Sequence, residues 1–556
     1  MKKILISVLC IFLIFLISIT FYLSIPLDYK FNYTESIDYN SLNYENIGNF
    51  KVLTLKGSNY EQGFYHGAVL KDEIKFIVDF MNSNINSNGC FKNFFNRIYI
   101  KFISKQYFKN IPAEYLEEIK GISDGSGIDF YSIFLLNVYD EIYNTLGCTN
   151  AAYWKYDDLI HGRNLDYNHA EILWDKSVIF YYINSEDKYN VVSVSWPGLI
   201  GVLTGMNDMG LSLGSMTSKS VNSSFNATPT GFLYRKILEK AKFLDEVTYI
   251  LQNNRVSIGN NLLVSSKEDF NAFVYEIDSK NVIIRNSETK NISAANHYNF
   301  LVNKEDSAYL SSFFREERAF ELTDSSYFDK ESMISLLRDR LSTEKRYSPI
   351  ANNWNILSVV FLNNKNSFIV AGNEVVPASH GRFFEIFIDD EGLKMVDTFN
   401  VYYSFLDSYN RFYSKHKSYF GDIDEFFNEK KLDELFDLYE MGVDFSVEKF
   451  YKYNNMIDFL IEINNVKKVE EYLRKLELLL DEINNYVSEC NDYEINIRFY
   501  NKDDSLVYQY YLLKMRYYKM VDNEEQMLYY YYKIIDSDTD QWIKNNADVF
   551  KKLKRR

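Results

Sequence analysis

Cys148, in the sequence Leu146-Gly147-Cys148-Thr149-Asn150, is the residue of this chain whose type and setting best suit nucleophilic chemistry. A thiol attacks as the thiolate, so a reactive cysteine needs a base nearby. None of the six histidines lies within ten residues of Cys148. A cut between Gly147 and Cys148 would free the cysteine's own α-amino group, whose pKa of roughly 7.7 to 8 suits it to take the thiol proton. The sequence therefore raises the hypothesis that Cys148 becomes a nucleophile once it is the first residue of a new chain.

Two charged residues follow Cys148 at a spacing that can return them to it. Arg163 lies fifteen residues further on and Asp166 three residues after that. If Cys148 starts one strand and the chain turns at Asp157-Asp158, the next strand comes back alongside the first. Arg163 would then favour the thiolate by its charge, and Asp166 could orient the freed α-amine. The alternative is that the arginine and the aspartate only pair with each other on the sheet.

The elements before Cys148 are mainly helical. A strand is predicted over Lys51–Leu55, followed by a helix that contains Gly63 and Gly67. Two glycines four residues apart on a helix indicate a close helix crossing, and His66 between them is expected to be a satisfied structural residue. Further helices are predicted over Phe91–Phe108, Pro112–Ile122 and Asp129–Tyr143.

The hydrophobic period changes at Cys148, where short alternating segments begin. One helix, predicted over Phe232–Leu251, interrupts them, and another is expected near Ser332–Leu341. Consecutive strands with few helices between them predict an α+β sandwich of layers. The predicted strands are Cys148–Lys155, Ile160–Asp166, Ser177–Ile183, Val191–Trp196, Gly201–Met206, Gly210–Met216, Leu262–Ser265, Ala272–Ile277, Val282–Arg285, Ile356–Leu362, Ser367–Ala371 and Phe383–Ile388.

Beyond about residue 410 the pattern is helical again, which predicts an all-α C-terminal extension of antiparallel hairpins. Its many tyrosines and phenylalanines are expected to pack between helices, and a protein-binding role for these helices stays open. The predicted helices are Phe426–Leu438, Ser446–Ile463, Val469–Val487, Ser505–Met520 and Asn523–Ile535.

The N-terminus carries an apolar run. Lys2 and Lys3 precede an uncharged stretch over residues 4–27, long enough to cross a bilayer as a helix. It lacks the short apolar core and the small-residue cleavage site of a signal peptide, so we expect an uncleaved anchor, with a removed signal peptide as the alternative. Lys2 and Lys3 favour the cytoplasmic side of the membrane, so the rest of the chain is expected on the outer side. If the apolar stretch is removed as a signal peptide, the protein is expected to be secreted.

Composition narrows the class of partner. A chain of 556 residues is expected to form more than one domain, and 47% hydrophobic residues describe a globular protein. The net charge of −16 argues against nucleic acid as a partner. The scattered histidines and the four cysteines form no cluster with metal-ligand spacing, so no metal and no cofactor are expected.

Gly210-Leu211-Ser212-Leu213-Gly214 fits the G-x-S-x-G pattern of serine hydrolases. That nucleophile elbow needs a strand, a sharp turn and a helix, whereas Ser212 stands inside an alternating segment followed by more strand-like sequence. We therefore do not expect Ser212 to be a nucleophile.

Six motifs in order along the chain carry a resemblance to a known family. Together they resemble the acyl-coenzyme A:6-aminopenicillanate acyltransferase family of self-cleaving N-terminal-nucleophile enzymes, which are related to penicillin V acylases and choloylglycine hydrolases. The resemblance covers about residues 50–400. The motifs are Tyr60-Glu61-Gln62-Gly63 with His66-Gly67, Gly147-Cys148-Thr149, Gly162-Arg163-Asn164-Leu165-Asp166, Gly205-Met206-Asn207-Asp208-Met209-Gly210-Leu211, Asn296-His297-Tyr298 and Ser358-Val359-Val360-Phe361.

The resemblance implies an αββα sandwich, self-cleavage before Cys148, and a role for each matching residue. Cys148 would be the nucleophile and its α-amine the base, with Arg163 and Asp166 tuning and orienting them. The backbone N–H of Asn207 and the side-chain amide of Asn296 would form the oxyanion hole. A later arginine of related enzymes has no secure match, and Arg346 is the nearest candidate.

The expected activity is hydrolysis of a linear N-acyl amide through a thioester on Cys148, yielding two non-covalent subunits after self-cleavage. Acyl transfer to a second amine, or a non-catalytic scaffold at the membrane, are the alternatives. The expected organisation is an anchor or signal over residues 1–27, a stalk over 28–49, a helical segment over 50–147, the hydrolase domain over 148–405 and α-helical 406–556.

Overall fold

The computed structural model describes the two-sheet body almost completely and part of the C-terminal helices. The described residues are 25–31, 33, 34, 37, 44–85, 90–143, 146–167, 170–302, 309–325, 328–339, 350–352, 354–374, 377–389, 392–399, 453, 457, 460, 461, 465–489, 506–536, 544 and 547. Helices of the predicted C-terminal extension between residues 401 and 452 lie outside them, as does Arg346.

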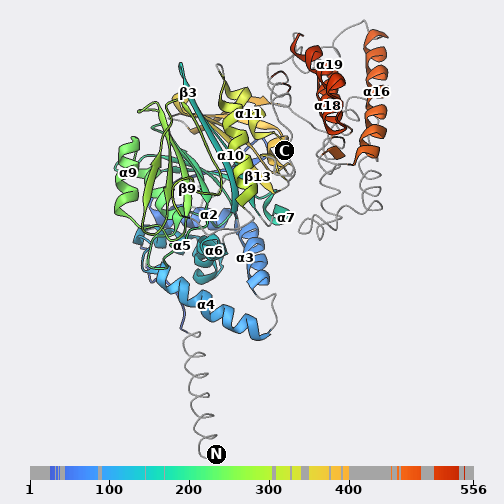
Figure 1. The fold of residues 1–556 in the computed structure, drawn as a ribbon. Coiled ribbons are helices and arrows are strands. Elements are labelled where there is room, and N and C mark those ends of the chain that lie inside the picture. Colours follow the sequence, from blue (N-terminus) through green and yellow to red (C-terminus); the bar gives the residue numbers. More distant parts are fainter. Residues whose placement is uncertain are drawn as a thin grey trace, which may run out of the picture.

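Two sheets lie at the centre of the molecule (Figure 1). The nine-stranded sheet has the order β1-β2-β5-β6-β7-β8-β9-β10-β11, in which β2 pairs parallel with β5. Its strands are β1 (Glu45–Ile47), β2 (Phe50–Lys56), β5 (Val178–Ile183), β6 (Val191–Ser195), β7 (Thr204–Asn207), β8 (Leu211–Thr217), β9 (Asn260–Ser266), β10 (Asn271–Ile277) and β11 (Val282–Arg285).

The seven-stranded sheet has the order β12-β3-β4-β13-β14-β15-β16 and is antiparallel throughout its described pairings. Its strands are β3 (Leu146–Lys155), β4 (Asp158–Tyr167), β12 (Asn291–Ala294), β13 (Asn355–Leu362), β14 (Ser367–Ala371), β15 (Phe383–Asp389) and β16 (Gly392–Phe399).

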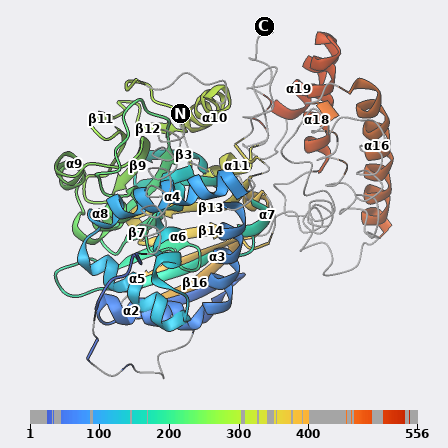
Figure 2. The ribbon, with the colours of Figure 1, turned by 90° about the horizontal axis from the view of Figure 1, so that it is seen from below.

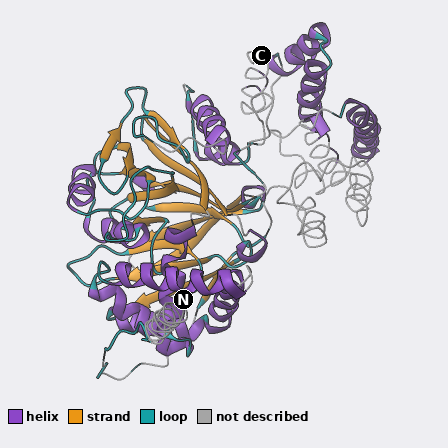
Figure 3. Ribbon diagram, turned by 60° about the horizontal axis from the view of Figure 1, so that its bottom comes forward, coloured by secondary structure: helices purple, strands orange, loops and turns teal. Residues whose placement is uncertain are grey.

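Helices cover the outer face of each sheet, so the body has four layers, as Figure 3 shows. One apolar core lies between the two sheets and extends to α7 and the C-terminal helices, a second joins the nine-stranded sheet to the helices α2 to α6, α8 and α9, and a third joins the seven-stranded sheet to α10 and α11. The predicted α+β sandwich of αββα layers is therefore confirmed. These helices are α2 (Asn59–Val69), α3 (Lys71–Ile85), α4 (Cys90–Phe108), α5 (Ala113–Ser126), α6 (Phe130–Tyr143), α7 (Ala170–Leu173), α8 (Thr230–Lys240), α9 (Leu244–Asn253), α10 (Tyr309–Thr323) and α11 (Lys330–Leu337).

Glycines let α2 and α5 cross closely. A Cβ atom on Gly63 would stand 2.0 Å from the carbonyl oxygen of Glu118, and one on Gly121 would stand 2.1 Å from that of Tyr60. The close crossing predicted from the glycine spacing is confirmed. His66 is also structural, since it is buried and its Nε2 accepts from the Gly198 N–H at 2.8 Å.

The helix predicted over Phe232–Leu251 is two helices, α8 and α9. Asn207 explains part of the break, because its Nδ2 donates to the carbonyls of Leu238 and Ala241, each at 2.8 Å. Glu246 then caps the start of α9 by accepting from the backbone of Phe243. Neither interaction leaves a trace in the local hydrophobic period.

The N-terminal stretch predicted as a stalk enters the body. Residues 45–47 form β1, paired with β2, and Leu27 is buried in the core beneath the N-terminal helices. The part of the chain that the structure describes holds no helix both long and apolar enough to cross a bilayer. The predicted anchor, residues 4–27, lies outside that part except for its last three residues.

The described C-terminal helices lie to one side of the four layers in Figures 1 and 2, and some of their apolar residues belong to the same cluster as the core between the sheets. They are α16 (Val466–Glu489), α18 (Leu506–Met520) and α19 (Glu524–Ile535). α18 packs on both of the others, and its tyrosines contact those of α19, such as Tyr518 and Tyr530 with stacked rings 5.7 Å apart. Tyr518 and Tyr530 thus pack between helices, as the sequence predicted, whereas Tyr529 and Tyr532 are exposed.

Candidate active site

The hairpin of β3 and β4 positions the nucleophile. Its register sets Cys148 opposite Leu165, Gly147 opposite Asp166 and Asn150 opposite Arg163. Side chains alternate across a sheet, so Cys148 and Arg163 share the face that looks into the core between the sheets, while Asp166 lies on the other face. The hairpin register therefore explains why Arg163 and Asp166 lie close to Cys148, as their spacing in the sequence predicted.

Cys148 is fully buried, and its sulfur accepts from Nη2 of Arg163 at 3.2 Å. Burial raises the pKa of the thiol, and the carboxylate of Asp166 raises it further. The guanidinium groups of Arg163 and Arg315 oppose this, because positive charge favours the thiolate. The site therefore holds a desolvated thiol whose ionisation depends on two arginines.

Arg163 is completely buried, an unusual position for a guanidinium. Besides the sulfur, it contacts the carbonyl oxygen of Leu203, just before β7. Burial lowers its pKa, while Cys148 and Asp166 counteract that shift. Gly214 on β8 gives it room, since a Cβ there would lie 3.2 Å from Cδ of Arg163.

Asp166 stands opposite Gly147, the residue before the nucleophile. Its Oδ2 accepts from Nδ2 of Asn352 at 2.6 Å and lies 3.8 Å from Nη1 of Arg315. Its Oδ1 is buried without a hydrogen-bond partner among the described residues. Burial raises the pKa of this carboxyl, opposed first by Arg315.

Asn296 lies two residues beyond the end of β12, where the pairing of Ala294 with Asn150 leads it to Cys148. Its Oδ1 accepts from the backbone N–H of Cys148 at 2.8 Å and from Nη2 of Arg315 at 2.9 Å. Its Nδ2 donates to the carbonyl of Thr217 at 2.8 Å, so in this structure the amide protons face the end of β8.

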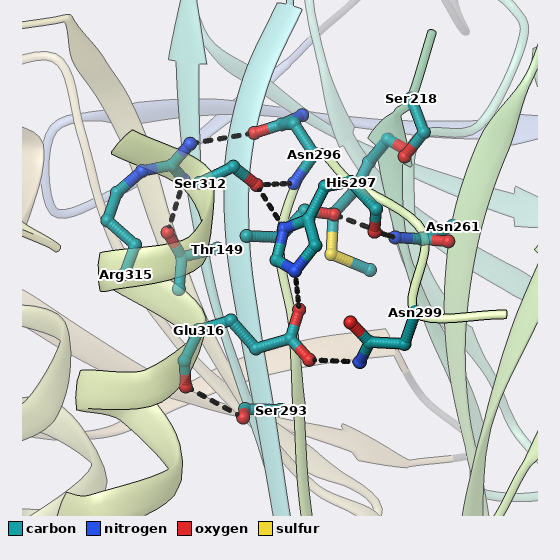
Figure 4. A network of polar contacts seen from close by, with 12 residues as sticks. Thr149, Ser218, Asn261, Ser293, Asn296, His297, Asn299, Ser312, Arg315 and Glu316 are labelled. Atoms are coloured by element: carbon teal, nitrogen blue, oxygen red, sulfur yellow. Dashed lines mark hydrogen bonds and ion pairs between the residues drawn. The ribbon is translucent and has the colours of Figure 1, made fainter. Parts of the chain in front are cut away.

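Arg315, which comes from α10, is a site residue that no sequence pattern indicated (Figure 4). Its Nη1 contacts the carbonyl oxygen of Cys148 and donates to Oγ1 of Thr149 at 2.6 Å. Arg346, the candidate that the sequence offered for a later arginine, lies outside the described residues, so that prediction stays untested. Arg315 stands in no motif, and only the packing of α10 against β3 and β12 reveals it.

The structure does not bring Asn207 to the cysteine. Leu203, whose carbonyl Arg163 contacts, marks the cysteine end of the β7–β8 hairpin, and Asn207 lies four residues further, roughly 13 Å along a strand. The Asn207 side chain is also fully engaged, because its Oδ1 accepts from the N–H groups of Met209 and Leu211 and its Nδ2 binds α8. Its observed role is to hold the turn.

Ser212 is a structural residue of the core between the sheets. Its Oγ lies 3.1 Å from Nδ1 of His161 and 2.9 Å from Nδ2 of Asn363, and all three side chains are buried. Burial lowers the pKa of His161 to about 3, so it is a neutral hydrogen-bonding group. Among the described residues no group of histidine, cysteine and acidic side chains could hold a metal ion.

An open apolar hollow lies beside the site. Tyr167, which pairs with Leu146 just before Gly147, forms the part of its wall nearest the β3–β4 hairpin. The rest of the described wall comes from α3, α6, α7 and the segment after β6. The lining residues are Ile77, Phe80, Met81, Leu136, Tyr139, Asp140, Tyr167, Leu173, Trp196, Pro197 and Leu199.

Part of this chain is similar to proteins of a known family. Residues 154–371 match the family model of the acyl-coenzyme A:6-aminopenicillanic acid acyl-transferase. The resemblance inferred from the motifs is confirmed. The segment similar to this acyl-transferase family includes Arg163, Asp166, Asn296 and Arg315 and begins six residues after Cys148.

Curated relatives match part of the chain at similar identity. Protein dcd1A of Dictyostelium discoideum is 24% identical over 234 residues, which are 35% of this chain and 51% of the relative. Acid ceramidase of Rattus norvegicus is 24% identical over 206 residues, 31% of this chain and 52% of the relative. The chain thus spans about half the length of the curated relatives it matches.

Two solved structures are similar at low identity. The Caenorhabditis elegans N-acylethanolamine-hydrolyzing acid amidase ortholog is 19% identical and covers 39% of this chain and 93% of its own, with a TM-score of 0.31. A mutant of conjugated bile acid hydrolase from Clostridium perfringens is 13% identical and covers 46% of this chain and 97% of its own, with a TM-score of 0.32.

Proposed function

We propose that this chain is an autoproteolytic cysteine amidohydrolase that cleaves linear N-acyl amides through a thioester on Cys148. The observation that carries the proposal is the setting of Cys148, whose sulfur meets Arg163 at 3.2 Å while its backbone nitrogen meets Asn296 at 2.8 Å. Nitrogen and sulfur of one residue are thus both held by groups suited to catalysis, as an N-terminal nucleophile requires.

Self-cleavage is proposed to begin with attack of the Cys148 sulfur on the carbonyl carbon of Gly147. The peptide C–N bond breaks as the C–S bond forms, the nitrogen gains a proton, and water then hydrolyses the thioester. The α-amine does not exist before the cut, so another group must take the thiol proton. We assign this role to Asp166, whose charge acts on the thiol and whose pKa is raised by burial, which makes its carboxylate a stronger base.

In turnover, the freed α-amine takes the proton from the thiol, and the thiolate attacks the acyl carbonyl of the substrate. The amine product leaves with a proton, and water releases the acid from the thioester. Arg163 favours the thiolate, and Oδ1 of Asn296 and Oδ1 of Asp166 orient the amine. If Asn296 also serves the oxyanion, its Nδ2 must leave the carbonyl of Thr217, and we assign Asn207 no part in the chemistry.

The hollow beside Tyr167 fits an apolar acyl group. Aliphatic and aromatic side chains make up most of its wall, and Asp140 is the charged residue among the described lining. An acyl chain there would bury apolar surface and leave its carbonyl toward Cys148. The names of the similar amidases and of acid ceramidase are compatible with such a small-molecule substrate.

After the cut, the fragment ending at Gly147 is proposed to stay bound as a non-covalent subunit. It contributes β1 and β2 to the nine-stranded sheet. Its buried Glu118 lies 2.7 Å from Nη1 of Arg235 on α8, which also pairs with Glu239 at 2.9 Å. Shared core and buried charges therefore join the two fragments.

The apolar stretch over residues 4–27 supports a proposed location at the cell membrane, with the catalytic body outside. Leu27 packs into the core, so such an anchor would join the body directly. Removal of this stretch as a signal peptide would instead release the protein. The C-terminal helices are proposed as a separate domain, open to a protein partner.

Acyl transfer to an amine uses the same residues and differs only in the final acceptor, so it remains the second candidate, which the family match supports. A panel of N-acyl amides tests the proposal on the cleaved protein, with Cys148→Ala as the control. Release of acid by the wild type alone supports hydrolysis. Formation of a new amide from an added amine, without acid, would point to transfer, and no reaction with either would favour a non-catalytic scaffold.

A further inference from the structure

A chain of hydrogen bonds runs from the backbone N–H of Asn296 through Ser312 to His297 (Figure 4). The N–H of Asn296 donates to Oγ of Ser312 at 2.6 Å, and the same Oγ lies 2.7 Å from Nδ1 of His297. A hydroxyl carries one proton. The carboxylate of Glu316, 3.3 Å from Nε2 of His297, favours the ring proton on Nε2, which leaves Nδ1 to accept the Ser312 proton.

The backbone around Asn296 is otherwise fixed. Nδ2 of Asn261, on β9, donates to the carbonyls of Ala295 at 2.9 Å and His297 at 2.5 Å, one on each side of Asn296. The N–H of Asn296 is therefore the group through which Ser312 sets the direction of that residue.

One turn of α10 contacts His297 and also carries Arg315, which reaches Cys148. The imidazole packs on Phe313 with ring centres 3.7 Å apart, and its Nε2 lies 3.3 Å from Oε2 of Glu316. Arg315 lies between these residues in sequence and contacts Cys148 and Asn296. A shift of this turn would thus move two groups at the nucleophile together.

We propose that Ser312 and His297 are positioning residues for the reaction at Cys148, with His297 acting as a neutral hydrogen-bond acceptor. The inference rests on the proposed function. Neither side chain contacts the cysteine, so both act through Asn296, whose Oδ1 receives the Cys148 nitrogen. Displacement of such a group by a fraction of an ångström lowers the rate without removing the substrate site.

The protonation state of His297 sets the direction of its hydrogen bond with Ser312. Acidic Glu316 from α10 and Glu276 from β10 face it, as do Arg285 from β11 and Arg315 from α10. Burial lowers the pKa of His297 below 6.5, so the ring is neutral at pH 7 and gains a proton only at lower pH. Protonation would turn Nδ1 into a donor, so the Ser312 oxygen would accept from both His297 and Asn296 and its own proton would lose its acceptor.

Four substitutions separate positioning from mere packing. Ser312→Ala and His297→Leu remove the hydroxyl and its acceptor. Ser312→Thr keeps a hydroxyl, and His297→Asn keeps an acceptor near Nδ1 that cannot gain a proton. Ser287→Ala is the matched control, because Ser287 is exposed and bonds only Thr289 among the described residues. Each full-length protein is assayed for self-cleavage rate and, once cleaved, for kcat and KM on a fluorogenic N-acyl amide across mildly acidic to mildly alkaline pH.

We expect Ser312→Ala and His297→Leu to lower kcat on the order of 10-fold to 100-fold with KM nearly unchanged, and to slow self-cleavage, while the threonine and asparagine variants keep most activity. As the pH is lowered below 6.5, the kcat of the wild type should decrease relative to that of His297→Asn. Unchanged kcat in the first pair, or equal loss in all four, would overturn the inference. If the wild type hydrolyses no amide, the proposed function fails, and the self-cleavage rates alone decide this inference.

Discussion

The backbone N–H of Cys148 donates to Oδ1 of Asn296 at 2.8 Å across 148 positions of sequence. This bond exists because β12 pairs with β3 and its register, carried two residues further, ends at the cysteine. In the uncut chain the nitrogen is an amide, and after a cut it would be the α-amine. The same acceptor can therefore hold the nitrogen in both states.

Replacing Arg163 should slow chemistry by making the thiolate harder to form. Arg163 lowers the pKa of Cys148 against the rise caused by burial, so Arg163→Met should move alkylation of Cys148 by iodoacetamide to higher pH. We expect the alkylation rate at pH 7 to fall about 10-fold or more, since one unit of pKa is tenfold in thiolate. Peptide mass mapping assigns the modified cysteine. A profile equal to that of the wild type would contradict the role given to Arg163.

Asp166→Asn should block self-cleavage while the fold survives. The amide keeps the shape of the side chain but cannot take a proton, so precursor should accumulate on a denaturing gel. The matched variant is Asp158→Asn on the same strand, whose side chain is exposed and pairs only weakly with Lys365. Cleavage of the Asp166 variant at the wild-type rate would exclude the carboxylate as the base.

Substitution of Asn207 should affect stability, whereas substitution of Asn296 should affect catalysis. Asn207→Ala loses four hydrogen bonds to the backbone and should lower the free energy of unfolding by about 1 to 3 kcal/mol, with kcat retained in the folded fraction. Asn296→Ala should instead abolish most catalysis. Denaturant unfolding and steady-state kinetics on both variants give the answer. Loss of kcat in folded Asn207→Ala would contradict the purely structural role given to the Asn207 side chain.

The buried charges between the fragments should dominate their association. Glu118→Ala takes one of two carboxylates from the buried Arg235 and breaks a buried ion pair, so it should destabilise the protein by about 3 to 5 kcal/mol. Asp79→Ala, which breaks an exposed pair with Lys75 on the same N-terminal fragment, should cost less than about 1 kcal/mol. Thermal unfolding of the two variants compares them directly, and equal shifts in Tm would contradict the account.

Local sequence was sufficient for the parts of the site that lie on one hairpin. Arg163 and Asp166 could be placed beside Cys148 because a turn near Asp157 and strand periodicity are both local features. Arg315 could not, since it reaches the site from α10 through packing between layers. The prediction for Asn207 was wrong because its motif indicates a hairpin near the site but does not indicate which end of that hairpin lies at the cysteine.

The layer architecture followed from the change of period at Cys148 and from the glycines of α2. The break between α8 and α9 did not, because a side chain from β7 ends the first helix. The entry of residues 45–47 into the sheet was also missed, since three residues are too few for alternation to be visible.

The cut before Cys148 is the central claim, and the masses of the purified full-length protein test it most directly. We predict two species on a denaturing gel, with N-terminal sequencing of the larger one starting at Cys148-Thr149-Asn150, and one uncut species for Cys148→Ala. A wild-type chain that stays whole after prolonged incubation, or a larger fragment that starts at any other residue, would contradict the account.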